Sequence, residues 1–581
     1  YRRQRQMCIR DRLSAALLVL CVSLVNAASK TYHFNVSYIH GSNPDGLHPR
    51  RSIGVNGKFH VPIINVNSTD QVNIRVRNNF KTRGTSIHAH GIFFNNTGYY
   101  DGAVGLGQCA VPPGEEIVHK VLNAPESPKD AQKQWGTYWA HGHYAGQYVD
   151  GYRTPLVIHK ADGEAYKYDD DYTIILADWY HREHDDLLHN EFLNAKNPDG
   201  DEPVPSAPLV YAARTPRNGD AHYLDGFNND MSLKFEPGKT YRLRFVNMAA
   251  ISMFHVWIDG HQMHMIEADG EDMEKLPVKT FSVAAGQRYS VLVTAKNSTS
   301  HNYQLHANMD PDMFDDPPKS LQMNVTGTIE YAKGAKVKHG KPPMKKYEPF
   351  DDMQLKPLRK EPMYPADIKH DLNVWLTKFS NGRNYAMFNN ISYRPPLTPV
   401  LYTAATTSHE LRNNNKTYGP STNAMVLPHL KYVQIRVLNW DDGYHPFHLH
   451  GTRFQVVHKS KDNVSKDPKK NPPLQEHQKN PVRRDTVSVP PGGSATLRFY
   501  TDNPGAWFFH CHIDWHLSAG LALPVVVAPD EIAKNQKIPH YLSKQCRMRG
   551  LPASGNAGGR NSTKHFGSLS HSAYPLSTSA S

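Results

Sequence analysis

The stretch His510-Cys511-His512-Ile513-Asp514-Trp515-His516 places a cysteine between two histidines, with a further histidine five residues after the cysteine. In an extended segment, side chains at positions i and i+2 lie on one face and the side chain between them lies on the other. His510 and His512 should therefore face one way and Cys511 the other. Cys511 and His516, joined by a distant histidine, match the His2Cys ligand set of a blue-copper electron-transfer site. The two flanking imidazoles then face a second metal centre.

Three more His-x-His pairs occur in the chain, namely His88 with His90, His141 with His143, and His448 with His450. One such pair is weak evidence in a chain with 34 histidines, but four pairs around a correctly spaced cysteine are strong evidence. A structural zinc site closes with four ligands and usually includes several cysteines. Eight paired imidazoles therefore suit three copper ions better than one zinc ion.

Four segments resemble the copper signatures of the multicopper oxidase family and stand in the family's order. They are His88-Ala-His-Gly, His141-Gly-His, His445-Pro-Phe-His-Leu-His-Gly and His510-Cys-His-Ile-Asp-Trp-His. The similarity runs from Lys30 to Cys546. Within the family, the segments Asn43-Pro-Asp-Gly, Met387-Phe-Asn-Asn-Ile-Ser-Tyr and Arg483-Arg-Asp-Thr are most similar to the fungal, yeast-type cell-surface iron(II) oxidases of high-affinity iron uptake.

The chain also contains a threefold repeat. Val72, Ile74 and Val76 alternate with polar residues, which is the pattern of a half-buried strand. Tyr241-Arg-Leu-Arg-Phe and Val433-Gln-Ile-Arg-Val repeat this pattern. Three units with frequent Gly and Pro turns predict an all-β chain. The resemblance implies three consecutive cupredoxin-like domains, each a Greek-key β-sandwich or barrel.

Composition indicates where these units begin and end. The middle unit keeps only His255 at its histidine position, so copper should bind to the first and third units. The expected boundaries are a signal peptide with a possible N-terminal artefact at 1–28, domains at 29–162, 163–337 and 366–547, a Lys- and Pro-rich linker at 338–365, and a disordered Ser- and Gly-rich tail at 548–581.

The resemblance assigns the copper ligands residue by residue and implies four copper ions. A type 1 copper would be held by His445, Cys511 and His516, with Leu521 at the axial position where some relatives have methionine. His88 and His448 would hold a type 2 copper. The type 3 pair would be held by His90, His141, His143, His450, His510 and His512. Electrons would pass from Cys511 to its two neighbours, and four of them would reduce dioxygen to two waters.

Acidic residues stand where the family keeps carboxylates beside this copper cluster. Asp101, in Tyr100-Asp-Gly, and Asp514 are therefore candidate proton donors. For Asp101 the alternative is a turn-forming Asp-Gly pair. The family also has a disulfide between its first domain and its C-terminal segment. Cys109 and Cys546 fit those places, and the alternative is two free buried thiols.

The oxidised substrate must be decided near His445 and His516, because laccases, ascorbate oxidases and ferroxidases share the copper machinery. The iron(II) oxidases have three carboxylates there, and this chain supplies Glu202, Asp315 and Asp441, with Asp310 as an additional acid. The favoured hypothesis is oxidation of iron(II) by dioxygen, with an iron permease as the partner that the resemblance implies. The alternatives are a laccase-type phenol oxidase, an ascorbate oxidase, and a non-catalytic copper-binding protein.

The remaining features concern location and partners. Leu13 to Val25 is an apolar run of signal-peptide length, and nine N-glycosylation sequons suit an exported glycoprotein, either extracellular or at the cell surface. After this segment the given sequence contains no run of about twenty apolar residues, so a membrane anchor is not predicted from it. The net charge of +12 comes without any nucleic-acid-binding motif, so nucleic acid is not an expected partner.

Two further groups of residues could be interpreted as metal sites. The middle unit contains His261, His264 and four methionines, and the preferred interpretation is core and surface residues. The methionines are Met248, Met253, Met263 and Met265. His181, His184 and His189 have helix-like spacing, and we expect them on a solvated surface.

Overall fold

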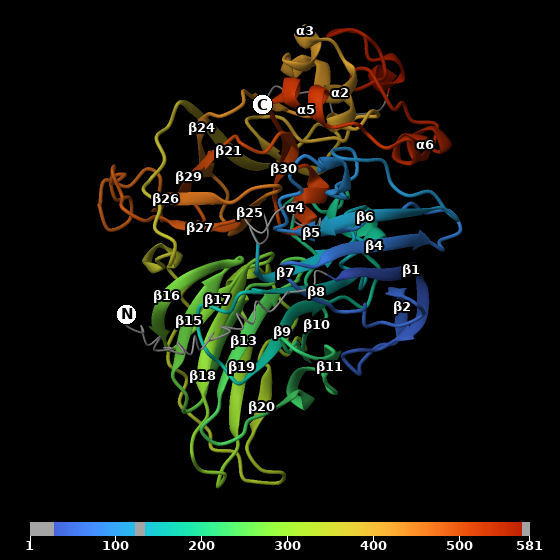
Figure 1. Cartoon of the computed structure of the whole chain (residues 1–581). Coiled ribbons are helices and arrows are strands. Elements are labelled where there is room, and N and C mark those ends of the chain that lie inside the picture. Colours follow the sequence, from blue (N-terminus) through green and yellow to red (C-terminus); the bar gives the residue numbers. More distant parts are fainter. Residues whose placement is uncertain (1–27, 123–133, 572–581) are drawn as a thin grey trace, which may run out of the picture.

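The structure is a computed structural model, and it describes residues 28–122 and 134–571. Strands predominate in it. They form six sheets, two for each of three consecutive units. Figure 1 shows the second unit, in green, below the first unit, in blue, and the third unit, in orange. The apolar run of the predicted signal peptide, residues 13–25, lies outside the described residues.

The first unit consists of two four-stranded sheets, with strand orders β2-β1-β4-β6 and β3-β8-β7-β5. Its strands are β1 (Ser29–Ser42), β2 (Arg50–Val55), β3 (Ile64–Asn67), β4 (Gln71–Asn78), β5 (His88–His90), β6 (Glu116–Leu122), β7 (Gly136–His141) and β8 (Arg153–His159). In β4 the apolar residues Val72, Ile74 and Val76 are buried, while Arg75 and Arg77 are exposed. The alternation in the sequence thus corresponds to one packed and one solvated face.

The second unit pairs a seven-stranded sheet, β11-β10-β9-β13-β18-β15-β16, with a five-stranded sheet, β12-β20-β19-β14-β17. Its strands are β9 (Asp170–Trp179), β10 (Ala207–Arg214), β11 (His222–Tyr223), β12 (Ser232–Lys234), β13 (Thr240–Asn247), β14 (Phe254–Ile258), β15 (Met263–Ala268), β16 (Glu271–Val278), β17 (Phe281–Val283), β18 (Arg288–Thr294), β19 (Tyr303–Met309) and β20 (Thr326–Glu330). A short helix, α1 (His184–Leu187), and the π-helical turn η2 (Leu188–Phe192) follow β9.

The third unit pairs the six-stranded sheet β22-β21-β24-β29-β26-β27 with the five-stranded sheet β23-β31-β30-β25-β28. Its strands are β21 (Ile368–Lys378), β22 (Asn384–Phe388), β23 (Met425–Leu427), β24 (Tyr432–Asn439), β25 (His445–Leu449), β26 (Phe454–Ser460), β27 (Val482–Arg484), β28 (Thr486–Val489), β29 (Ser494–Tyr500), β30 (Gly505–Cys511) and β31 (Ala522–Val527). Every residue of β30 is buried, because neighbouring strands and units cover both of its faces.

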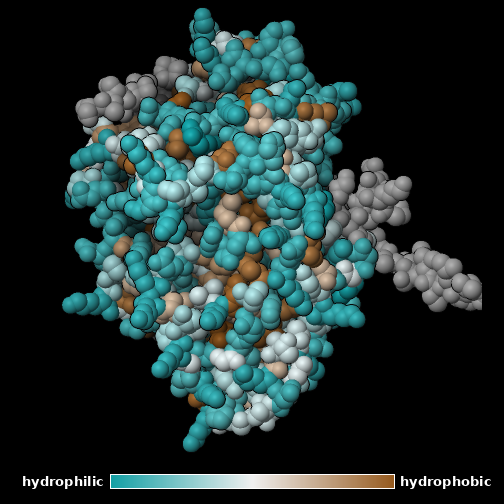
Figure 2. Space-filling view, turned by 90° about the vertical axis from the view of Figure 1, so that its left-hand side faces the viewer, coloured by the Kyte–Doolittle hydropathy of each residue, from teal (hydrophilic) through white to brown (hydrophobic). Residues whose placement is uncertain are grey.

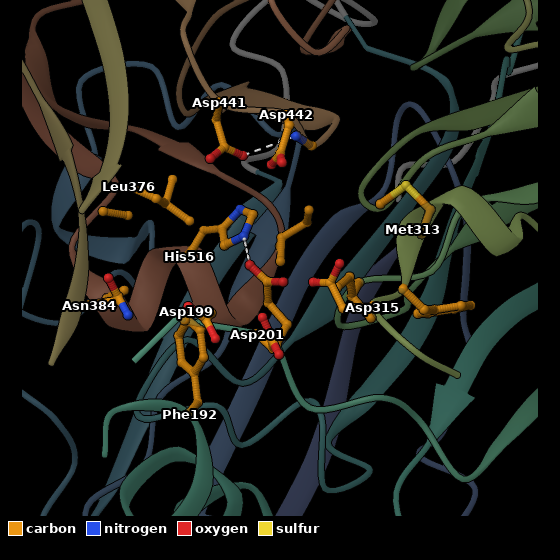
Figure 3. Close-up of a pocket in the computed structure, with 18 of the residues that line it drawn as sticks. Phe192, Asp199, Asp201, Met313, Asp315, Leu376, Asn384, Asp441, Asp442 and His516 are labelled. Atoms are coloured by element: carbon orange, nitrogen blue, oxygen red, sulfur yellow. Dashed lines mark hydrogen bonds and ion pairs between the residues drawn. The ribbon is translucent and has the colours of Figure 1, made fainter. Parts of the chain in front are cut away.

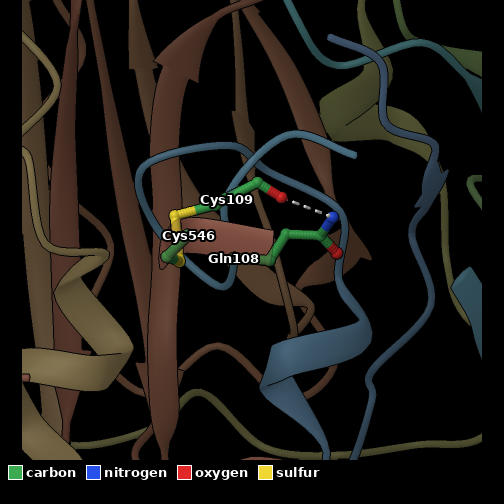
Figure 4. Close-up of a disulfide and its surroundings, with 3 residues drawn as sticks. All are labelled: Gln108, Cys109 and Cys546. Atoms are coloured by element: carbon green, nitrogen blue, oxygen red, sulfur yellow. Dashed lines mark hydrogen bonds between the residues drawn. A yellow bond between two sulfur atoms is a disulfide. The ribbon is translucent and has the colours of Figure 1, made fainter. Parts of the chain in front are cut away.

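The third unit also carries the helices that an all-β prediction leaves out. They are α2 (Val400–Thr406), α3 (His409–Arg412), α4 (Asp514–Ala519), α5 (Pro529–Asn535) and α6 (His540–Met548). Helix α6 supplies Cys546, which forms a disulfide with Cys109 of the first unit (Figure 4). The bond joins residues 437 positions apart. No helix among the described residues is long and apolar enough to cross a membrane.

The linker at 338–365 and the tail at 548–581 differ in how well the structure agrees with what their composition predicts. The linker runs along the outside and is held where buried Asp352 meets Lys459 and Arg484 of the third unit. The tail differs from the predicted disorder as far as His571. Buried Ala557 pairs through its backbone with Thr417 and Leu397, and the side chain of Asn556 bonds the neighbouring loop. Composition alone does not reveal such long-range pairing.

The packed interior lies between the paired sheets and continues across the units. Buried residues of this core include Met248, Met253, Met263 and Met265, as expected for the second unit. The face in Figure 2 is mostly hydrophilic, with small hydrophobic areas between charged and polar side chains. The ligand histidines of the first and third units come from strands near the centre of the molecule, around β5, β7, β25 and β30 (Figure 1).

Candidate metal centre and acidic pocket

Strand pairing brings the four histidine pairs together. In the first unit β5 pairs with β7, so that His88 stands opposite His141. In the third unit β25 pairs with β30, so that His448 stands opposite His510. The two sheets face each other across the boundary between the units. As a result, rings that are hundreds of residues apart in sequence stack, as His90 does on His448 with centroids 3.6 Å apart.

The paired histidines form three sets whose ligand atoms lie within 4.8 Å of one another. The sets are His88, His90 and His448; His90, His141 and His512; and His143, His450 and His510. The first two sets share His90, and a further group of His88, Asp101 and His450 links the first set to the third, so the three sets form one continuous cluster. All eight rings are buried or nearly so.

The ring nitrogens of this cluster fit a metal. His88 and His448 each donate from Nδ1 to a backbone carbonyl, of Asp101 and Asp485 respectively, at 2.8 and 2.9 Å. The opposite Nε2 of each ring is buried without a hydrogen-bond partner in the structure. Metal-binding histidines in proteins use one nitrogen for the metal and donate the other N–H in this manner. His141, His143 and His512 also have unpartnered Nε2 atoms.

Burial favours the neutral form of four cluster histidines, and a metal ligand must be neutral. Burial, followed by repulsion from neighbouring imidazoles, lowers the pKa of His450 and His510 well below the ordinary value. Burial and the same kind of repulsion lower the pKa of His143 and His512 to about 3.

Two carboxylates lie near the cluster. Asp101 is fully buried and accepts a hydrogen bond from His450 Nδ1 at 2.8 Å. Asp514 lines a cavity of about 290 Å³ that is also lined by His141, His143, His510 and His512. The structure therefore places both predicted proton donors beside the cluster histidines.

His184 corrects the expectation of a solvated histidine group. Its ring is fully buried, 2.6 Å from Asp514 Oδ2, and stacks on Trp515 with centroids 5.0 Å apart. Burial lowers the pKa of His184, but the carboxylates of Asp514 and Asp185 outweigh it and raise the pKa to about 10. Spacing could not reveal this contact, because its two partners come from different units.

The second set of metal-ligating residues faces the opposite side of β30. Cys511 Sγ lies 3.7 Å from His445 Nδ1 and 3.5 Å from His516 Nδ1. Burial raises the pKa of the Cys511 thiol, but the two histidines outweigh it and lower the pKa to about 7. Leu521 is fully buried beside this set, and its carbonyl accepts from the Cys511 backbone N–H at 3.0 Å.

A pocket of about 380 Å³ opens beside His516 (Figure 3). Two of its carboxylates contact the Nε2 atoms of His516 and His445, whose Nδ1 atoms face Cys511. Glu202 Oε1 lies 2.5 Å from His516 Nε2, and Asp441 Oδ2 lies 2.9 Å from His445 Nε2. Burial raises the pKa of Asp441, but the contact with His445 outweighs it and lowers the pKa to about 2.

The pocket contains more acids than the sequence motifs indicated. Asp315 stands on the wall opposite Asp441 in Figure 3. Burial, followed by the charges of Glu202 and Asp201, raises the pKa of Asp315. The additional pocket carboxylates are those of Asp199, Asp201, Asp312 and Asp442. Asp310, expected to assist, is not among the pocket residues, since it pairs with His255 Nε2 at 2.8 Å instead.

The three paired-sheet units and the two histidine centres define a copper-binding oxidase of the cupredoxin type. Three family models described as multicopper oxidase match residues 35–163, 170–334 and 393–531. The chain belongs to the multicopper oxidase family, and copper is its cofactor. The prediction of an all-β, cupredoxin-like fold is thereby confirmed.

Individual relatives and solved structures are similar to this chain over most of its length. The iron multicopper oxidase fer1 of Mycosarcoma maydis is 50% identical over 564 residues, which is 96% of this chain and 90% of that protein. The crystal structure of Fet3p, described as a multicopper oxidase that functions in iron import, matches with a TM-score of 0.82 and 34% identity over 92% of this chain and 97% of that one. A laccase from Botrytis aclada matches with a TM-score of 0.74 and 26% identity, over 90% and 92% of the two chains.

Proposed function

We propose that this protein oxidises iron(II) to iron(III) and transfers the electrons to dioxygen, which is reduced to two waters. The observation that carries the proposal is the acidic pocket beside His445 and His516. Iron(II) favours oxygen ligands, and the pocket presents Glu202, Asp315 and Asp441 with further acids around them. Relatives named as iron oxidases or as functioning in iron import support the same substrate.

The residues divide this work between two copper centres. His445, Cys511 and His516 would hold the type 1 copper, with Leu521 as its non-coordinating axial neighbour. His88 and His448 would hold the type 2 copper. The type 3 pair would be held by His90, His141, His143, His450, His510 and His512. These four coppers would supply one-electron acceptance at one end and dioxygen reduction at the other.

The pocket carboxylates bind and orient the iron ion against the two histidines. An electron leaving an iron held by Glu202 has a path through the 2.5 Å contact to His516, and Asp441 gives the equivalent path to His445. From Cys511 the path continues through the backbone to His510 and His512. Carboxylates also prefer iron(III) over iron(II), which makes the donor easier to oxidise.

Protons reach the cluster from the two carboxyl groups that flank it. Asp101 would transfer a proton at His450, to which it is hydrogen-bonded at 2.8 Å, and Asp514 would do so from the cavity that it lines. His184 holds the Asp514 carboxylate in place from the second unit. In the organism we propose a secreted or cell-surface enzyme that supplies iron(III) to an iron permease.

The test compares iron(II) with hydroquinone as donors to the copper-loaded protein, followed by oxygen consumption at one pH. We expect kcat/KM to favour iron strongly. Glu202→Ala and Asp441→Ala should each lower the iron value by about ten- to a hundredfold, because each removes an iron ligand and an electron path, while hydroquinone oxidation stays within about threefold.

A laccase-type phenol oxidase is the competing function. It predicts that hydroquinone is the better donor and that the two alanine variants lose both activities equally. Either result would refute the iron assignment. The copper assignment has its own test. Cys511→Ser should abolish the blue absorption band, which arises from charge transfer between a cysteine and the type 1 copper. It should leave in place the near-ultraviolet band of the type 3 copper pair.

A further inference from the structure

Two exposed tryptophans stack on the outer face of the third unit, next to the acidic pocket. Trp375 of β21 and Trp440, which follows β24, have ring centroids 5.7 Å apart and planes inclined by 15°. Their exposed fractions are 41% and 37%, which is high for the largest apolar side chain. Trp440 donates from Nε1 to Asn373 Oδ1 at 2.8 Å, so its ring is fixed.

Both tryptophans are covalent neighbours of pocket residues. Trp375 precedes Leu376, and Trp440 precedes Asp441. Because successive residues of a strand point to opposite faces, Leu376 points into the pocket while Trp375 points outward. Figure 3 shows Leu376 and Asp441 on the same wall of the pocket. The indole pair therefore lies on the outer side of that wall.

A short path connects the indole pair to the type 1 ligands. It runs from Trp440 across one peptide unit to Asp441 and then across the 2.9 Å contact to His445 Nε2. The pocket itself, with its many carboxylates, suits a small cation better than an aromatic ring. The indole faces have the opposite preference, since they attract aromatic rings and organic cations.

We propose that Trp375 and Trp440 form a second electron-donor site, a stacking platform for electron-rich aromatic amines. Each amine loses one electron and leaves as its radical cation, and no bond to it is made or broken. The electron enters at Trp440 and passes through Asp441 to His445. Four such events and four protons complete the reduction of one dioxygen to two waters. The inference rests on the copper assignments proposed above.

The experiment measures kcat/KM of the copper-loaded protein for N,N-dimethyl-p-phenylenediamine and for iron(II) at the same pH. Trp375→Ala removes the ring that has no covalent link to Asp441. We expect it to lower the amine value about two- to tenfold, the usual contribution of one aromatic or cation–π contact, and to leave the iron value unchanged. Trp440→Phe should give a smaller loss, because a ring remains.

Tyr500→Ala is the matched control. Tyr500 packs against Tyr432 at the opposite end of β24, with centroids 4.6 Å apart, so the variant also loses one member of an aromatic pair on this sheet. We expect neither donor to be affected. Calorimetry with benzyltrimethylammonium, an aromatic cation that cannot be oxidised here, gives a second measurement. It should bind Trp375→Ala about two- to tenfold more weakly than the wild-type protein.

Three outcomes would overturn the proposal. Amine oxidation could be unchanged in Trp375→Ala, or both donors could decline together, which would indicate a disturbed Asp441. Displacement of the aromatic cation by methyl mannoside would instead assign the platform to a sugar. If wild-type protein oxidises amines but not iron, the proposed function fails while the platform stands, because the calorimetric measurement does not depend on turnover.

Discussion

At the scale of single residues, the acidic pocket combines carboxylates of two kinds. Glu202 and Asp441 are tied to the two histidines of the Cys511 centre. Asp315 stands on the wall opposite Asp441 (Figure 3), and burial together with neighbouring charges raises its pKa. A carboxyl group with a raised pKa loses its charge earlier as the pH falls. The pocket should therefore bind iron(II) more weakly in mild acid than three isolated aspartates would.

Asp201→Asn tests this coupling. The variant removes a charge that raises the pKa of Asp315, so that Asp315 stays ionised to a lower pH. We expect KM for iron(II) to rise about two- to fivefold at neutral pH, from the lost attraction, while the acid limb of its pH profile moves to lower pH. Asp371→Asn, which removes an exposed acid paired with Arg436, should change neither. An unshifted acid limb would contradict the coupling.

At the scale of elements, the sequence predicts whatever depends on local spacing. The period of two fixed the faces of His510, Cys511 and His512, and the strands around Val72 and Val433 alternate as expected. Contacts between units were not predictable, since Asp201 and Asp442 reach one pocket from different loops and units. The burial of His184 against Asp514 could not be predicted for the same reason. Asn463, in the sequon Asn463-Val-Ser, also has a structural role that the sequon does not indicate, because its side-chain amide donates to two backbone carbonyls.

The junction between β18 and β28 is an element-scale feature that no motif indicated. Arg288, at the start of β18, makes two 2.6 Å contacts with Asp485, just before β28. Asp485 Oδ1 also lies 3.2 Å from His90 Nε2, and its carbonyl accepts from His448. All of these groups are buried. The second unit, to which we assign no copper ligand, thus orients histidines of the first and third units.

Arg288→Met should therefore affect both stability and copper binding. Removing one partner of a buried ion pair leaves the other charge uncompensated, and we expect about 3–5 kcal/mol of lost unfolding free energy. Copper content should decline, with the near-ultraviolet band weakened more than the blue band. Arg436→Met breaks an exposed pair with Asp371 and should cost less than about 1 kcal/mol. Equal weakening of both bands would contradict a role at His90 and His448.

At the scale of the whole molecule, the units are joined by buried charge as well as by apolar contact. Glu267 of the second unit accepts from the backbone N–H of Thr137 at 2.5 Å and from its hydroxyl at 2.8 Å, which ties β15 to β7 of the first unit. Arg242 lies 2.6 Å from the same carboxylate. Since β7 carries His141, this contact also helps to place the histidine cluster.

The pKa of Glu267 predicts how the free energy of unfolding of the whole protein changes as the pH falls. Burial raises its pKa, but Arg242 and Arg244 outweigh it and lower the pKa from 4.5 to about 2. A lowered pKa contributes stability that is complete above pH 4.5 and is lost as the pH falls towards 2, about 3 kcal/mol in all. The free energy of unfolding in urea should thus decline more steeply below pH 4.5 for the wild-type protein than for Glu267→Gln. Glu116→Gln, at an exposed pair with Arg75, should follow the wild-type curve, and parallel curves for all three proteins would refute this role of Glu267.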